Sequence, residues 1–264
     1  MFPRLLQPLP GEPTRIWREH PLARHLVTAL CFNQTGYAIT NAVTGQLAGT
    51  VTNRTIASER RRSPTGVALG TNGTNPGTSV GLVQLTSPGW LASTDGTIVV
   101  RARWVLQDAP GAIICESAGT VGGLYFTTGG IVWLYPAMAA TGGPVAVGQW
   151  ATIAVTRSAA GAVQYYTDGV LVSTDNTGTT VAMPFNWLFN NSNDSSLYNG
   201  DIEFIHIWNG RILSAGEIYD QFVNPYGLYE RSLMTNTLYH FPSGAAIPPT
   251  PYYYRQHITR QASV

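Results

Sequence analysis

The sequence predicts an all-β fold, a sandwich or barrel of antiparallel strands, and three observations support this. The 264 residues include 28 glycines and 17 prolines, which favour turns over long helices. Short apolar runs recur every 8 to 14 residues or so, separated by Gly, Pro, Asn or Asp. One segment alone, residues 213–223, has a helical pattern. The clearest strand-like runs are 81–85, 97–106, 111–117, 124–128, 131–136, 150–157, 163–174, 185–190 and 201–208.

Both ends of the chain differ in composition from its middle. Residues 1–21 are rich in Pro and Arg and show no period of 2 or 3.6, so we expect an extended basic N-terminal arm. From residue 26 the run LVTALCF predicts the first buried strand. Residues 231–264 form a Pro/Tyr/Arg-rich segment, which predicts a C-terminal arm. The single predicted domain therefore covers residues 22–230.

Local signals identify one hairpin and one helix start. Asp168-Gly169 separates two apolar runs, and this pair supplies the positive φ angles of a type I′ turn. Ser214 is followed three residues later by Glu217, the pattern of a helix N-cap with a capping box.

Alternation along two strands gives two further expectations. Within residues 150–157 large apolar and polar side chains alternate, and we expect Trp150 to fill the core. His206 stands between Ile205 and Ile207, so the same rule predicts that His206 faces solvent.

The charges are sparse and unevenly placed. All 15 basic residues are arginine, so the chain lacks the lysine that a Walker A loop, a protein kinase or a Schiff-base enzyme requires. Residues 1–62 carry eight arginines and three acids, residues 63–230 four arginines and eleven acids, and residues 231–264 three arginines and no acid. Two basic arms thus flank an acidic body, and we expect them to dock on an acidic neighbour, another copy of the chain included.

Several partners are not expected. No apolar stretch is long enough to span a membrane and the start has no secretory signal core, so we expect a soluble chain without a membrane partner. Arg60, Arg61 and Arg62 lack interleaved aromatics, and we predict no nucleic-acid binding. Cys31 and Cys115 both lie in apolar runs, which predicts buried free thiols.

Four segments, taken in order, resemble a known family. Residues 148–158 (GQWATIAVTRS), 163–172 (VQYYTDGVLV) and 199–218 (NGDIEFIHIWNGRILSAGEI) are similar to the second half of laminin G-like domains in the concanavalin A-like jelly-roll superfamily. Residues 21–36 resemble that group's opening strand, so the likeness spans residues 21–229. It implies a two-sheet antiparallel jelly-roll sandwich with one short helix after the last long strand.

The two ends of this domain resemble uncharacterised virion proteins of tailed bacteriophages. The opening combines basic residues, Trp17 and the run His-Pro-Leu-Ala-Arg at 20–24, and the ending is Asn-Pro-Tyr-Gly-Leu-Tyr at 224–229. In those proteins the fold serves as a structural or decoration module, so this resemblance implies a non-enzymatic role.

The enzymatic and metal-binding properties of the superfamily find little support. Many laminin G-like domains have acids after the opening strand, where this chain has Asn33, Gln34 and Asn41, so we predict no metal and no cofactor. Glucanases of the superfamily place three acids on one strand. This chain offers Asp201 and Glu203, which share a strand face at i, i+2, and lacks the third. We predict no catalytic residue, with hydrolysis kept as a third alternative.

One loop has the composition of a sugar-binding site. Amides and hydroxyls fill residues 190–196, and aromatic residues stand on either side. Such groups hydrogen-bond sugar hydroxyls and stack on sugar rings, although a polar hairpin loop beside core aromatics explains the same pattern. The candidate glycan-binding residues are Trp187, Asn190, Asn191, Asp194 and Tyr198.

The main functional hypothesis is a phage virion structural protein, a capsid decoration or cement protein anchored by its arms. Its partners would be phage capsid or tail proteins, with homo-oligomers in the assembly, and its location the virion, assembled in the host cytoplasm. The alternative is a lectin-like tail or fibre module that recognises a host glycan. Exposed Arg and aromatic residues dominate interface energetics, and the candidate interface residues are Arg4, Arg15, Trp17, Arg18, Tyr252, Tyr253, Tyr254 and Arg255.

Overall fold

The computed structural model confirms the predicted all-β sandwich with one short α-helix. It describes residues 15–230 except 33–37, 52–58, 65–66, 71–82, 87–93, 106–110, 116–122, 127–131, 136–142, 177–179, 181, 184 and 190–199. The predicted division into two arms and one domain stays a prediction.

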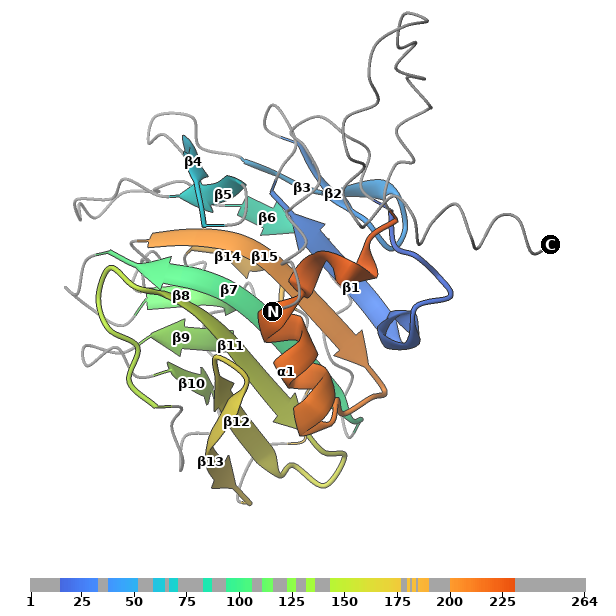
Figure 1. Ribbon diagram of the computed structural model, residues 1–264, viewed down its shortest axis with the longest axis vertical. Helices are drawn as coiled ribbons and strands as arrows, with labels where there is room; N and C mark the ends of the chain where they lie inside the picture. The colour runs from blue at the N-terminus through green and yellow to red at the C-terminus, as the bar shows by residue number, and fades with distance from the viewer. Residues whose placement is uncertain are drawn as a thin grey trace, which may run out of the picture. The chain divides into compact units, whose positions relative to one another are not determined.

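All strand pairs are antiparallel, and the strands follow one hydrogen-bonded path (Figure 1). The path runs β10-β9-β8-β14-β6-β3-β2-β1-β15-β7-β11-β12-β13, with β5 pairing to the start of β15 and β4 to β5. The strands are β1 (Leu26–Cys31), β2 (Ala38–Asn41), β3 (Gln46–Val51), β4 (Glu59–Arg62), β5 (Val67–Gly70), β6 (Val83–Leu85), β7 (Gly96–Trp104), β8 (Gly111–Cys115), β9 (Gly123–Phe126), β10 (Val132–Tyr135), β11 (Trp150–Arg157), β12 (Val163–Thr167), β13 (Val170–Asp175), β14 (Trp187–Leu188) and β15 (Gly200–Asn209).

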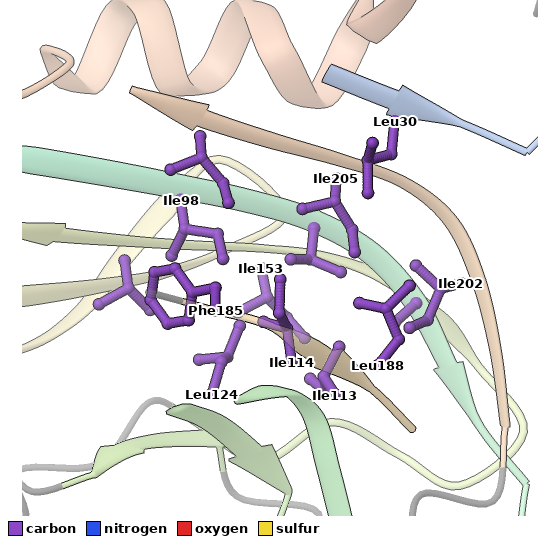
Figure 2. Close-up of a cluster of buried hydrophobic side chains, with 14 of the residues drawn as sticks. Leu30, Ile98, Ile113, Ile114, Leu124, Ile153, Phe185, Leu188, Ile202 and Ile205 are labelled. Carbon is purple, nitrogen blue, oxygen red and sulfur yellow. The ribbon is translucent and has the colours of Figure 1, made fainter. Parts of the chain in front are cut away.

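The main core lies between two layers of this path. One layer contains β1, β15, β7, β11 and β12, and the other contains β8, β9, β14 and β6. Figure 2 shows side chains from both layers pointing toward one another, among them Ile98 and Ile205 from the first and Ile114, Leu124 and Leu188 from the second. All five are fully buried. Burial of apolar side chains between the two sheets is thus the main stabilising contribution.

A second apolar cluster covers the outer face of the first layer. The part of this cluster that lies over the sheet comes from four segments. These are helix α1 (Ala215–Val223), the 3-10 helices η1 (Pro21–Ala23) and η2 (Pro225–Leu228), and the segment before η1. Figure 1 shows α1 lying across this layer. Ile218 of α1 packs in one cluster with Val99 of β7 and Trp208 of β15. Strands β7 and β15 are therefore buried on both faces.

The local sequence signals are confirmed. Asp168 and Gly169 have φ angles of 50° and 82° and join β12 to β13. At the start of α1 the Ser214 side chain accepts a hydrogen bond from the backbone N–H of Glu217, and the Glu217 carboxylate accepts one from the backbone N–H of Ser214, which completes the capping box. Cys31 and Cys115 are both buried, and neither is in a disulfide bond, as predicted.

Candidate functional site

A polar layer lies on the outer face of the first sheet, where β15, β7 and β11 run side by side. On β7, Arg101 and Arg103 alternate with Val100, Ala102 and Trp104, which point into the main core. This alternation turns both guanidinium groups away from the main core and toward β15. The two acids considered for catalysis meet these arginines.

Asp201 forms an ion pair with Arg103. The Arg103 Nε donates a hydrogen bond of 2.8 Å to Oδ2 of Asp201, and the Nη2 of Arg103 donates to the same oxygen. The Asp201 side chain is fully buried, whereas that of Arg103 is 30% exposed. The Arg103 guanidinium also lies 5.3 Å from the centre of the Trp150 ring. The expectation that Trp150 fills the core is therefore wrong, because this half-buried ring lies on the outer face and Ala151 takes the core position.

Glu203 lies at an irregularity of β15 and is held by two other elements. The register of β15 against β7 shifts between Ile202 and Phe204, which places Glu203 in a β-bulge. Nε of Arg101 lies 3.3 Å from Oε2 of Glu203, and the hydroxyl of Tyr226 donates a 2.5 Å hydrogen bond to Oε1. Glu203 is fully buried and Arg101 nearly so. Tyr226 belongs to η2, so this carboxylate joins η2 to the sheet.

The acid pair therefore shares one face, as the sequence predicts, but each carboxylate already has its own arginine. A retaining glycosidase needs two carboxylates that reach one sugar, one of them protonated as general acid. Asp201 and Glu203 are both buried, and each is paired with a guanidinium group of its own. In this arrangement the pair joins β7, β15 and η2.

His206 is buried, so the expectation that it faces solvent is wrong. Its Nδ1 lies 2.8 Å from Oε1 of Gln221 in α1, and its Nε2 lies 2.8 Å from the hydroxyl of Tyr229. The ring also stacks on Phe204 at 4.6 Å. Burial lowers the pKa of His206 to about 4, partly offset by the hydrogen bond with Gln221, so the imidazole is neutral near pH 7. Period-2 alternation does place His206 on the face opposite Ile205 and Ile207, but the helical segments cover that face of β15.

Trp187 lies on the outer face of the second layer. It pairs with Gln84 of β6 and Cys115 of β8, while the next residue, Leu188, points into the main core. The Trp187 ring is half-buried and packs against a small cluster that contains Cys115 and Tyr125. Its indole N–H is shielded from solvent and has no acceptor in the part of the chain that the structure describes. The other candidate glycan-binding residues, Asn190, Asn191, Asp194 and Tyr198, lie outside the described residues.

The candidate interface residues that the structure describes lie on a segment bonded to the domain. The backbone N–H of Trp17 donates to the carbonyl of Leu228 at 2.9 Å, and that of Glu230 donates to the carbonyl of Arg15 at 2.8 Å. Ile16 between them is buried, whereas Arg15, Trp17 and Arg18 are exposed, Trp17 by 48%. Arg4, Tyr252, Tyr253, Tyr254 and Arg255 lie outside the described residues.

Sequence reasoning missed the arginine partners of the acid pair and the partners of His206. The sequence did contain a signal for the arginine partners, because two arginines at i, i+2 on β7 match two acids at i, i+2 on β15. It contained no signal for Gln221 and Tyr229, because their approach to His206 depends on how α1 and η2 pack.

In the part of the chain that the structure describes, no three His, Cys, Asp or Glu side chains gather as a metal-ion site would require. Nor does the described part of the chain include a helix with the length and apolar character needed to cross a membrane.

Two solved structures share this architecture. Domain 4 of AbnA, a GH43 extracellular arabinanase from Geobacillus stearothermophilus in complex with arabinotriose, matches with a TM-score of 0.54 and 16% identity, covering 79% of this chain and 98% of that domain. Trypanosoma rangeli sialidase matches with a TM-score of 0.53 and 15% identity, covering 81% of this chain. The match spans 36% of the sialidase chain. At such identities the likeness shows the fold alone.

The family comparison is more direct. No curated protein matches the chain. The family model Laminin_G_3, described as concanavalin A-like lectin/glucanases superfamily, matches residues 83–219, just over half of the chain. This range includes all of β6 to β15 and the first five residues of α1. The chain therefore belongs to the concanavalin A-like lectin/glucanase superfamily, as the laminin G-like resemblance predicts.

Proposed function

We propose that the chain is a non-catalytic carbohydrate-binding module whose sugar site is centred on Trp187. The observation that carries the proposal is the position of this side chain: a half-buried aromatic ring on the outer face of the second layer, beside the exposed Gln84. A flat apolar ring stacks on the apolar face of a sugar, and this contact needs only the exposed part of the ring. Gln84, the exposed neighbour of Trp187 on β6, supplies further amide donors and acceptors.

The fold neighbours support the class of ligand. Domain 4 of the arabinanase is a domain of the same architecture in complex with arabinotriose, and the match spans nearly all of it. The sialidase is a second neighbour whose name refers to a sugar. An oligosaccharide is therefore the ligand class that we infer, and arabinotriose and sialic acid are the first probes.

The absence of turnover is part of the proposal. Asp201 and Glu203 are buried and paired with Arg103 and Arg101. A substrate would have to displace these arginines before it met either carboxylate, at the expense of leaving a buried charge unpaired. The alternative is a hydrolase that uses this acid pair. It predicts that the wild type cleaves a polysaccharide and that the Glu203→Gln variant loses this activity.

Binding is tested by calorimetry with arabinotriose and sialic acid and by a glycan array that covers other sugar classes. We expect binding to at least one glycan, weakened about tenfold or more by Trp187→Ala. Trp187→Phe keeps a ring and removes the N–H, so it should weaken binding less. Trp17→Ala, at an exposed tryptophan of the N-terminal segment, is the matched control and should leave affinity unchanged. Near-UV circular dichroism checks that each variant is folded. Failure to bind any glycan would overturn the proposal.

A second candidate function is a virion structural protein attached through its arms, and one observation favours it. Backbone hydrogen bonds to Leu228 and from Glu230 hold residues 15–17 in place, yet Trp17, Arg15 and Arg18 project into solvent. Trp and Arg side chains fixed in this way lose little conformational entropy when a partner binds, which is a property of interface hot spots. The two functions are compatible in one chain.

Attachment is tested on particles from the source. Labelling with an antibody to the domain, followed by electron microscopy, should decorate the head if the chain is a capsid decoration protein and the tail or fibres if it recognises a host. A chain that lacks residues 245–264, and separately Trp17→Ala, should fail to incorporate while the domain stays folded. Unlabelled particles, or normal incorporation of both variants, would contradict this second function.

A further inference from the structure

The strand β13 forms one end of the sheet. Among the described residues it pairs with β12 alone, and it closes the strand order (Figure 1). At the edge of a sheet, the outward backbone N–H and C=O groups of a strand can hydrogen-bond to a further strand. The binding partner that can hydrogen-bond to these groups is therefore an extended strand, from this chain or from another.

The side chains of this edge are unusually apolar. Val170, Leu171 and Val172 are 63%, 47% and 40% exposed. Leu171 lies opposite Tyr166, which packs in the cluster under α1, so Leu171 is on the helix-covered face of the sheet. Tyr219 of α1 is 53% exposed and lies against the hairpin turn. Natural edge strands are commonly protected by lysine, proline or an inward-pointing charge, and the first five residues of β13, VLVST, contain none of these.

We propose that β13 pairs with β13 of a second copy of this chain, antiparallel across a two-fold axis at Leu171. In that register Leu171 faces its own equivalent and Val170 faces Val172 of the other copy, so the three exposed apolar side chains meet one another. No like charges are brought together, because the paired stretch is uncharged. The formal net charge of the chain is +1, so two copies repel each other little.

The shape of the edge limits the strength of this contact. The register of β12 against β13 shifts between Tyr165 and Tyr166, which leaves Val172 as an extra residue and bends the strand. Pairing is thereby confined to the few residues around Leu171. An interface of this size is in the weak class, with a Kd on the order of 10–100 µM.

Sedimentation analysis of the full chain over a concentration series measures the association. We expect a monomer–dimer equilibrium in the wild type and a Kd at least about tenfold higher in Leu171→Lys, which places two positive charges face to face. Leu47→Lys is the matched control, because Leu47 is 58% exposed but lies on β3, which has neighbours on both sides. It should dimerise as the wild type does. A wild type that stays monomeric, or a Leu171→Lys variant that still dimerises, would overturn the proposal.

Disulfide trapping tests the register. Residues opposite each other in an antiparallel pair have Cα atoms about 4.5–5.5 Å apart, within the range of a disulfide. Leu171→Cys should therefore give a covalent dimer on mild oxidation, whereas Leu47→Cys should not. Cys31 and Cys115 do not interfere, since both are buried. Equal crosslinking of the two variants, or none with Leu171→Cys, would contradict pairing at this position.

Discussion

Arg103 on β7 binds one oxygen of Asp201 on β15 through two of its nitrogens, and the next pair along the same strands, Arg101 and Glu203, forms an ion pair with 3.3 Å between Nε and Oε2. The two pairs lie side by side on the face that α1 and η2 partly cover. The acids that look like a catalytic pair in the sequence thus serve to join β7, β15 and η2.

Removing one charge from this layer should destabilise the fold. Glu203→Gln leaves the Arg101 guanidinium buried without its counter-ion, and we expect the free energy of unfolding to fall by about 3 kcal/mol. Urea denaturation measures this change. Adding Arg101→Met to Glu203→Gln removes the orphaned charge, so the double variant should recover part of the loss. A fully stable Glu203→Gln that has lost polysaccharide turnover would instead identify a hydrolase.

The buried His206 should make stability depend on pH. Burial lowers its pKa from 6.5 to about 4 in the folded chain, whereas in the unfolded chain it titrates near 6.5. Between these pH values the unfolded state binds the extra proton, so the free energy of unfolding falls as the pH decreases from about 6.5 to about 4. The loss from this group amounts to about 3 kcal/mol and is absent above that window.

Denaturation curves at several pH values test this expectation. His206→Gln removes the titrating group, so its stability should fall less steeply between pH 6.5 and 4 than that of the wild type. His25→Asn, at an exposed histidine with a positive φ that Asn tolerates, should keep the wild-type slope. Identical slopes in all three proteins would contradict the assignment to His206.

The β12–β13 turn offers a test of packing against α1. Gly169 has a φ of 82°, and a Cβ added there would lie 2.8 Å from Cδ2 and 3.2 Å from Cα of Tyr219. Gly169→Ala therefore combines backbone strain with a clash. Gly45 has a φ of 71° with open space around it, so Gly45→Ala carries the strain alone, about 1 kcal/mol. Thermal unfolding should show that Gly169→Ala costs at least about 1 kcal/mol more. Equal losses would mean that α1 does not rest on this turn.

The fold was largely predictable because its signals are local. Asp168-Gly169 defines the hairpin by backbone conformation, and the Ser214–Glu217 capping box defines the start of α1. Trp150 shows a misjudged signal: it is in phase with Thr152 on the outer face, not with Ile153 in the core, so strict alternation already opposed a core position.

The site was less predictable because its contacts join elements far apart in the chain. Nothing in the run around His206 reveals that α1 folds back onto it and brings Gln221 within 2.8 Å. The bulge at Glu203 is equally invisible, although it decides that this acid meets Arg101 and Tyr226. Trp187 was identified from its type and its polar neighbours, but its unused indole N–H becomes evident from the packing of β14 between β6 and β8.

Glycan binding by the purified chain, compared between the wild type and Trp187→Ala on one array and then by calorimetry, tests the central claim most directly. We predict that the wild type binds at least one oligosaccharide class, that Trp187→Ala loses about tenfold or more in affinity, and that Trp17→Ala does not. A wild type that binds no glycan, or a folded Trp187→Ala variant with unchanged affinity, would contradict the account.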